Sequence, residues 1–133
     1  GFNETDGVGT FGLGDPDGAA SGTFTFNTST DTVSWNITYS NLATLNGFHI
    51  HTGNFNQNGG IVVPMPLTPG SGTLSGSMVD TDVDSIAANP NGFYANIHDS
   101  NFGSGAVRGQ IPEPASLALL ALPAVMALRR RRA

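Results

Sequence analysis

The chain of 133 residues is long enough for one small domain, and its many glycines, prolines and small polar residues favour short strands joined by tight turns. It has no cysteine, which excludes disulfides and thiolate chemistry. Residues 1–111 carry one arginine against nine acidic residues, a formal charge of −8, which excludes the basic surface that nucleic-acid binding needs.

Apolar residues alternate with polar ones in several short segments, which is the pattern of half-buried β-strands. The clearest segment is residues 32–42, where Val33, Trp35 and Ile37 share one face, and we expect Trp35 to be buried. Further segments of this kind are residues 21–26, 72–79, 92–98 and 105–111. Only residues 82–88 look helical, with Asp82 as the candidate N-cap. We therefore expect an all-β fold of roughly seven or eight antiparallel strands, a sandwich or a barrel.

All three histidines of the chain occur near strand ends. In residues 47–53 the apolar side chains must face the core, so His49 and His51 share the opposite face. The same alternation in residues 92–98 places His98 off the core. We expect the two strands to be neighbours in the sheet, so that the three histidines cluster. Three imidazoles from neighbouring strands can bind copper or zinc, with an affinity that falls below about pH 6 as they protonate. A hydrogen-bonded cluster that orients the adjoining loop is the alternative.

Other candidate sites are weaker. Asp80, Asp82 and Asp84 have the spacing of a calcium-binding EF-hand loop, but the glycine and the bidentate glutamate of such a loop are absent. A capped turn with solvated carboxylates is the favoured interpretation. We expect Arg108, the only cation of residues 1–111, to neutralise a carboxylate such as Asp99. No nucleophile elbow or acid–base pair is evident, so we expect no catalytic residues.

The composition changes abruptly at residue 112. The chain continues with Pro112, Glu113 and Pro114, then an apolar run of 14 residues (115–128), and closes with Arg129, Arg130, Arg131 and Arg132 before the last alanine. As a helix this run would be about 21 Å long, shorter than a hydrocarbon core of roughly 30 Å. The arginines favour a cytoplasmic C-terminus. We expect residues 112–133 to be a short membrane or sorting segment, separate from a domain of residues 1–111.

The tail resembles a PEP-CTERM sorting signal in all three of its parts. That resemblance implies processing by an exosortase-type enzyme in a bacterium with an outer membrane. It also implies export, anchoring in the membrane through the tail, and delivery to the cell surface or the extracellular matrix. Extracellular polysaccharide is then an expected partner.

The body of the chain resembles a CHRD domain, over about residues 10–111. The most specific matches are His49-Ile50-His51, Asn96-Ile97-His98 and Val107-Arg108-Gly109-Gln110. The chain departs from the usual family pattern at Asp99, where threonine is common, and at Ala106, where glutamate is common. The resemblance implies an immunoglobulin-like sandwich or barrel without an established catalytic activity.

Residues 47–51 and 96–99 also resemble copper-binding strands of Cu,Zn superoxide dismutases. This resemblance implies a Greek-key sandwich in which His49, His51 and His98 are copper ligands. A fourth, bridging histidine, a zinc-ligand loop and a cysteine pair are absent, which disfavours a complete dismutase site. We therefore predict a non-catalytic bacterial surface or matrix protein. The alternative is a histidine-based copper- or zinc-binding surface protein with dismutase-like redox activity.

Overall fold

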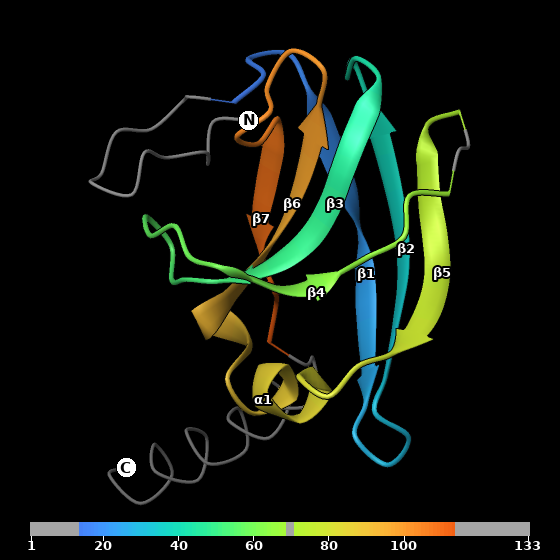
Figure 1. Cartoon of the computed structure of the whole chain (residues 1–133), viewed down its shortest axis with the longest axis vertical. Coiled ribbons are helices and arrows are strands. Elements are labelled where there is room, and N and C mark those ends of the chain that lie inside the picture. The colour runs from blue at the N-terminus through green and yellow to red at the C-terminus, as the bar shows by residue number, and fades with distance from the viewer. Residues whose placement is uncertain (1–13, 69–70, 114–133) are drawn as a thin grey trace, which may run out of the picture.

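The computed structural model describes residues 14–68 and 71–113, in which seven strands form two antiparallel sheets (Figure 1). The first sheet has the order β1-β2-β5, with β1 (Ala19–Asn27), β2 (Thr32–Ser40) and β5 (Thr73–Val79). The second has the order β4-β3-β6-β7, with β4 (Ile61–Pro64), β3 (Leu45–Thr52), β6 (Phe93–Asp99) and β7 (Val107–Gln110). The predicted antiparallel all-β fold is confirmed, and the chain passes between the sheets three times.

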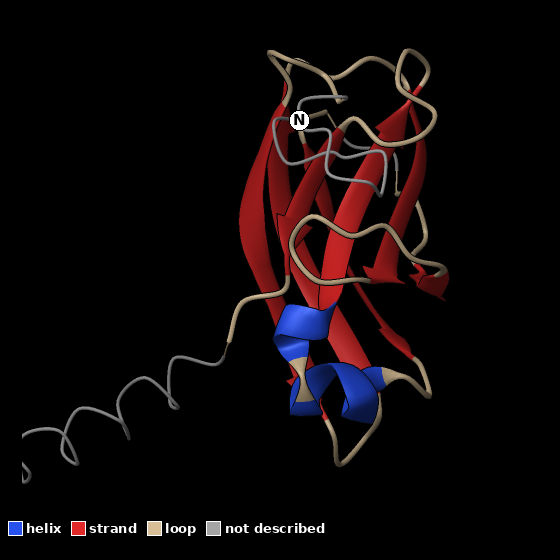
Figure 2. Cartoon of the chain, turned by 90° about the vertical axis from the view of Figure 1, so that its left-hand side faces the viewer, coloured by secondary structure: helices blue, strands red, loops and turns tan. Residues whose placement is uncertain are grey.

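The helical part of the described chain is small and lies at one end of the strands (Figure 2). Helix α1 (Val83–Ala88) and the 3₁₀ turn η1 (Pro90–Gly92) connect β5 to β6. The N-cap residue of α1 is Asp82, as predicted, although its side chain makes no capping hydrogen bond. Val83 and Ile86 are buried, so the helix adds apolar side chains to this end of the core.

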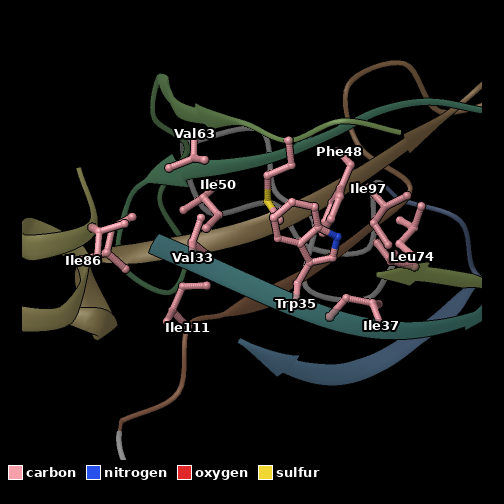
Figure 3. Close-up of a cluster of buried hydrophobic side chains, with 13 residues drawn as sticks. Val33, Trp35, Ile37, Phe48, Ile50, Val63, Leu74, Ile86, Ile97 and Ile111 are labelled. Atoms are coloured by element: carbon pink, nitrogen blue, oxygen red, sulfur yellow. The ribbon is translucent and has the colours of Figure 1, made fainter. Parts of the chain in front are cut away.

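The hydrophobic core lies between the two sheets (Figure 3). Val33, Trp35 and Ile37 point inward from β2, and Phe48 and Ile50 point inward from β3. Trp35 is only 4% exposed, and its ring meets the Phe48 ring at an angle of 74° with 6.2 Å between centroids. The predicted burial of Trp35 is therefore confirmed, and with it the assignment of the inward face of β2.

Strand β4 had no counterpart among the predicted strands. It has four residues, which are too few to display a clear alternation, and it pairs with β3 at the edge of the second sheet. The register of β3 against β4 shifts between Ile50 and His51. This irregularity lies next to the histidines, at the point where β3 leads into the loop of residues 53–60.

No helix within residues 14–68 and 71–113 is long and apolar enough to cross a membrane. The apolar run of residues 115–128, predicted to form a short membrane helix, lies outside the described residues. Pro112 and Glu113 follow β7 and are exposed.

Candidate metal site

The three histidines cluster on the face of the β3–β6 pair that points away from the core. In the antiparallel register His98 lies opposite Gly47, one diagonal step from His49. The ring centroids are 5.0 Å apart for His49 and His98, 5.6 Å for His49 and His51, and 6.0 Å for His51 and His98. One nitrogen from each ring lies within 4.8 Å of the other two. The predicted clustering is confirmed, since β3 and β6 are neighbours.

The cluster is less exposed than an outer sheet face normally is. His51 is 8% exposed, and His49 and His98 are half-buried. Tyr94, also buried, stacks on the His51 ring with 4.9 Å between centroids and an angle of 10°. The Arg108 guanidinium carbon lies 3.5 Å from the centroid of the Tyr94 ring. An ordered row of guanidinium, phenol and imidazole groups therefore borders the site on one side.

Backbone carbonyls hold two of the three rings. His51 Nδ1 lies 3.0 Å from the Gly59 carbonyl oxygen, and His98 Nδ1 lies 3.0 Å from the Gly103 carbonyl oxygen. A carbonyl only accepts, so both Nδ1 atoms carry the proton and each Nε2 keeps a lone pair. Those two Nε2 atoms and His49 Nδ1 are buried and have no hydrogen-bond partner among the described residues.

The environment of His49 and His51 favours their neutral imidazoles. Burial lowers the pKa of His49, and positive charge on His98 or His51 would lower it further. Burial also lowers the pKa of His51; the Gly59 hydrogen bond opposes this effect, and the charges of His98 and Arg108 add to it. The lone pairs of these two rings therefore remain available at lower pH than those of a free imidazole.

This donor set fits a copper or zinc ion. One nitrogen from each of the three rings converges, and two of the rings bond a backbone carbonyl through their other nitrogen, which is the usual outer arrangement around a metal-ligating histidine. Bonds of about 2.0–2.1 Å around a tetrahedral ion place its ligand atoms about 3.4 Å apart. Nitrogens that lie up to 4.8 Å apart must therefore move slightly closer when an ion binds. Hydrogen bonds to backbone carbonyls, the alternative explanation for the cluster, account for only two of its six ring nitrogens.

Arg108 and Asp99 make different hydrogen bonds in the described part of the chain, which does not bear out the expected pairing of Arg108 with a carboxylate such as Asp99. The Asp99 carboxylate is fully buried and accepts backbone N–H groups from Ala43, Asn101 and Phe102. Arg108 donates instead to the Asn54 carbonyl and to the side chains of Asn58 and Gln110. The two buried charges therefore hold different parts of the chain.

The acidic segment of residues 80–84 forms a turn that leads into α1, which is the interpretation favoured from the sequence. Asp80 Oδ1 accepts the Asp82 N–H at 2.9 Å, and the Asp80 carbonyl accepts the Val83 N–H at 3.3 Å. Asp84 is exposed in the first turn of α1. Of the groups of three or more potential ligands, the histidine cluster is the one that the described residues bring together.

Several parts of the site were beyond sequence reasoning. The carbonyls of Gly59 and Gly103 have no side-chain signal, because every residue carries a carbonyl. Tyr94 was recognisable as a residue on the histidine face, but its stacking on His51 depends on the β3–β6 register.

The histidines fall within a recognised domain. Residues 9–111 match the CHRD domain family, a range that includes all three histidines and the closing strand β7. No curated protein and no solved structure matches the chain significantly. CHRD domains are typical of secreted, extracellular proteins. The chain belongs to the CHRD domain family.

Proposed function

We propose that the CHRD domain of this chain binds one copper or zinc ion through His49, His51 and His98. The observation that carries this proposal is the convergence of three buried ring nitrogens that lack a partner among the described residues. Burying such groups without a partner is costly, and an ion would satisfy all three together. Copper(II) generally binds nitrogen ligands more tightly than zinc does, so we expect it to bind more tightly here.

We infer a binding role rather than dismutase catalysis. The whole sequence has no fourth histidine to bridge a second metal and no cysteine pair. This proposal includes the Greek-key, superoxide-dismutase-like arrangement of strands that the sequence resembles. It is supported by the two antiparallel sheets, of which one carries histidines on a central strand. On this basis the site is a simpler, single-ion relative of the dismutase site.

Metal retention tests the proposal directly. The full chain, kept in mild detergent because of its apolar tail, is dialysed against Cu(II) or Zn(II) and then against buffer without metal. We expect about one ion per chain to remain, with nitrogen ligation in the electron paramagnetic resonance spectrum of the copper form. His51→Asn and His98→Asn should each abolish retention. Asp84→Asn is the matched control for adventitious binding to the acidic surface, and it should retain the ion. A wild-type chain without retained metal, or histidine variants that retain it equally, would contradict the proposal.

We further propose that the protein is exported and sorted to the bacterial surface or extracellular matrix, with residues 112–133 as a PEP-CTERM signal for an exosortase-type enzyme. Membership of the CHRD family supports export, and the order of motifs in the tail supports sorting. Polysaccharide is the partner that we propose there. A polar cleft of about 560 Å³ supports this choice, because its amides both donate to and accept from hydroxyl groups; it is lined in part by Asn54, Gln57, Asn58 and Asn89.

A further inference from the structure

Two buried charges lie close to the histidine cluster and serve different loops. Asp99 is 0% exposed and directly follows His98 at the end of β6. Arg108 is 7% exposed and lies on β7, next to β6 in the sheet. Burying a charge is expensive unless hydrogen bonds compensate it, so the loops that supply those bonds are held firmly in place.

Asp99 organises the loop after β6. Its Oδ1 atom accepts the N–H groups of Asn101 and Phe102 at 3.0 and 2.8 Å, and its Oδ2 atom accepts the Ala43 N–H at 2.9 Å. Phe102 then begins a second turn, closed by the Gly105 N–H to the Phe102 carbonyl at 3.0 Å, and within it the Gly103 carbonyl accepts the proton of His98 Nδ1. The carboxylate therefore acts on the His98 ring through the backbone and not by contact.

Arg108 organises the loop between β3 and β4. Its Nη2 atom donates to the Asn54 carbonyl at 2.8 Å, and its Nη1 atom donates to Asn58 Oδ1 at 3.1 Å. The next residue, Gly59, supplies the carbonyl that accepts the proton of His51 Nδ1. The same guanidinium covers Tyr94, which stacks on His51. Arg108 thus controls the position of the His51 ring by two routes.

We infer that Asp99 and Arg108 are positioning residues that set the tautomers of two ligand histidines, Asp99 for His98 and Arg108 for His51. Each residue places one carbonyl against Nδ1, so that the Nε2 lone pair faces the centre of the cluster. In His49 the buried nitrogen without a described partner is Nδ1, and neither loop supplies a carbonyl that sets the tautomer of this ring. That this arrangement preforms a metal site rests on the proposed function. The assignment of the tautomers does not depend on it.

Nitrogen-15 NMR of the metal-free full chain measures the tautomers. With labelled histidine, long-range correlations should show Nδ1–H for His51 and His98 in the wild type. Asp99→Ala, which removes both carboxylate oxygens and with them the acceptor of the Asn101 and Phe102 N–H groups, should change the His98 pattern and leave His51 unchanged. Arg108→Met should change His51 and leave His98 unchanged. Asp99→Asn keeps an oxygen for the Asn101 and Phe102 N–H groups, so it should preserve the His98 tautomer.

Metal affinity is the second measurement. Loss of such outer partners typically lowers metal affinity about 10- to 100-fold, and we expect this range for Asp99→Ala and Arg108→Met. If Arg108→Met does not fold, Asn58→Ala removes one anchor of the same loop from the exposed side and should change His51 alone. Should Asp99→Ala fail to fold, Asp99→Leu fills a similar volume without any acceptor and should change His98 alone.

The outcomes separate this inference from the proposed function. Variants that leave both tautomers unchanged, or that alter both rings together, would overturn the assignment of one positioning residue to each histidine. A wild type that shows the expected tautomers but retains no metal would refute the proposed function and support the positioning roles. A wild type that binds metal with either Nε2 protonated in the free protein would refute the positioning roles alone.

Discussion

At the scale of single residues, a missing side chain makes room for the histidines. A Cβ atom at Gly47 would lie 2.9 Å from His49 Cε1 and 3.1 Å from His98 Cδ2. Gly47 pairs with His98 across the sheet, so any larger residue would push between the two rings. The glycine before Phe48 is therefore part of the site, although it has no functional group.

The lowered pKa values of His49 and His51 predict how stability depends on pH. The unfolded chain binds protons at these histidines near an ordinary pKa of about 6.5, whereas the folded chain resists protonation. Stability from these two groups is therefore fully present above about pH 6.5 and is lost as the pH falls through their lower folded pKa values. Urea unfolding of the metal-free chain at pH 7.5, 6.5 and 5.5 measures this dependence.

A double variant, His49→Gln with His51→Gln, provides the control for the pH experiment. Without these two imidazoles, the free energy of unfolding should change much less between pH 7.5 and 5.5. Equal pH dependence of the wild type and the double variant would show that other groups cause the loss.

At the scale of single elements, the pairing of β1 with β2 explains a glycine in the interior of a strand. The two strands pair over all nine residues of β1, and Gly22 lies opposite Ile37. A Cβ atom at Gly22 would clash with the Asn36 carbonyl oxygen and would lie 2.7 Å from Ile37 Cα. Both neighbours are backbone atoms, which cannot move without shifting the strand. Glycine, which usually weakens a strand, is here the residue that permits close approach.

Gly22→Ala should therefore destabilise the protein by about 1–3 kcal/mol, the usual range for overpacking. Gly109→Ala is the matched control, because Gly109 also lies in a strand and a methyl group added there would meet no atom within 4 Å. Urea unfolding followed by Trp35 fluorescence measures both variants. Similar stability of the two variants would mean that β1 moves away from β2 at little cost.

At the scale of the whole molecule, Ile111 is the last residue of the core among those that the structure describes. Ile111 is 1% exposed, and its N–H donates to the Phe93 carbonyl at 3.0 Å. Beyond it, Glu113 accepts a hydrogen bond from Asn91 on the surface. The family match also ends at residue 111. Within the described residues, the last core side chain and the end of the family match therefore coincide at residue 111.

Deletion of residues 112–133 should yield a folded domain that is secreted in soluble form. The deletion removes no member of the described core, so we expect the free energy of unfolding to change by no more than about 1 kcal/mol. Urea unfolding of the shortened chain, compared with the full chain in the same detergent, measures the change. Loss of the cooperative transition would show that the tail contributes to the core.

The amino-acid sequence by itself determined which side chains face the core. Period-two alternation is a local property of a strand, so it placed Trp35 inward and His49 and His51 on the opposite face before any strand had a partner. The same alternation placed His98 on the outer face as well, and its clustering with the other two was expected only on the further inference that the two strands are neighbours. The short β4 carried too little of this pattern to be recognised.

Only the tertiary structure decided what surrounds the histidines. The register of β3 against β6 brought His98 beside His49 and stacked Tyr94 on His51, and register depends on turns and packing far along the chain. The loops that supply the two carbonyls are held by Asp99 and Arg108, which the sequence had paired with each other by charge alone. Carbonyl groups are identical in every residue, so their positions follow from the path of the folded backbone and not from residue type.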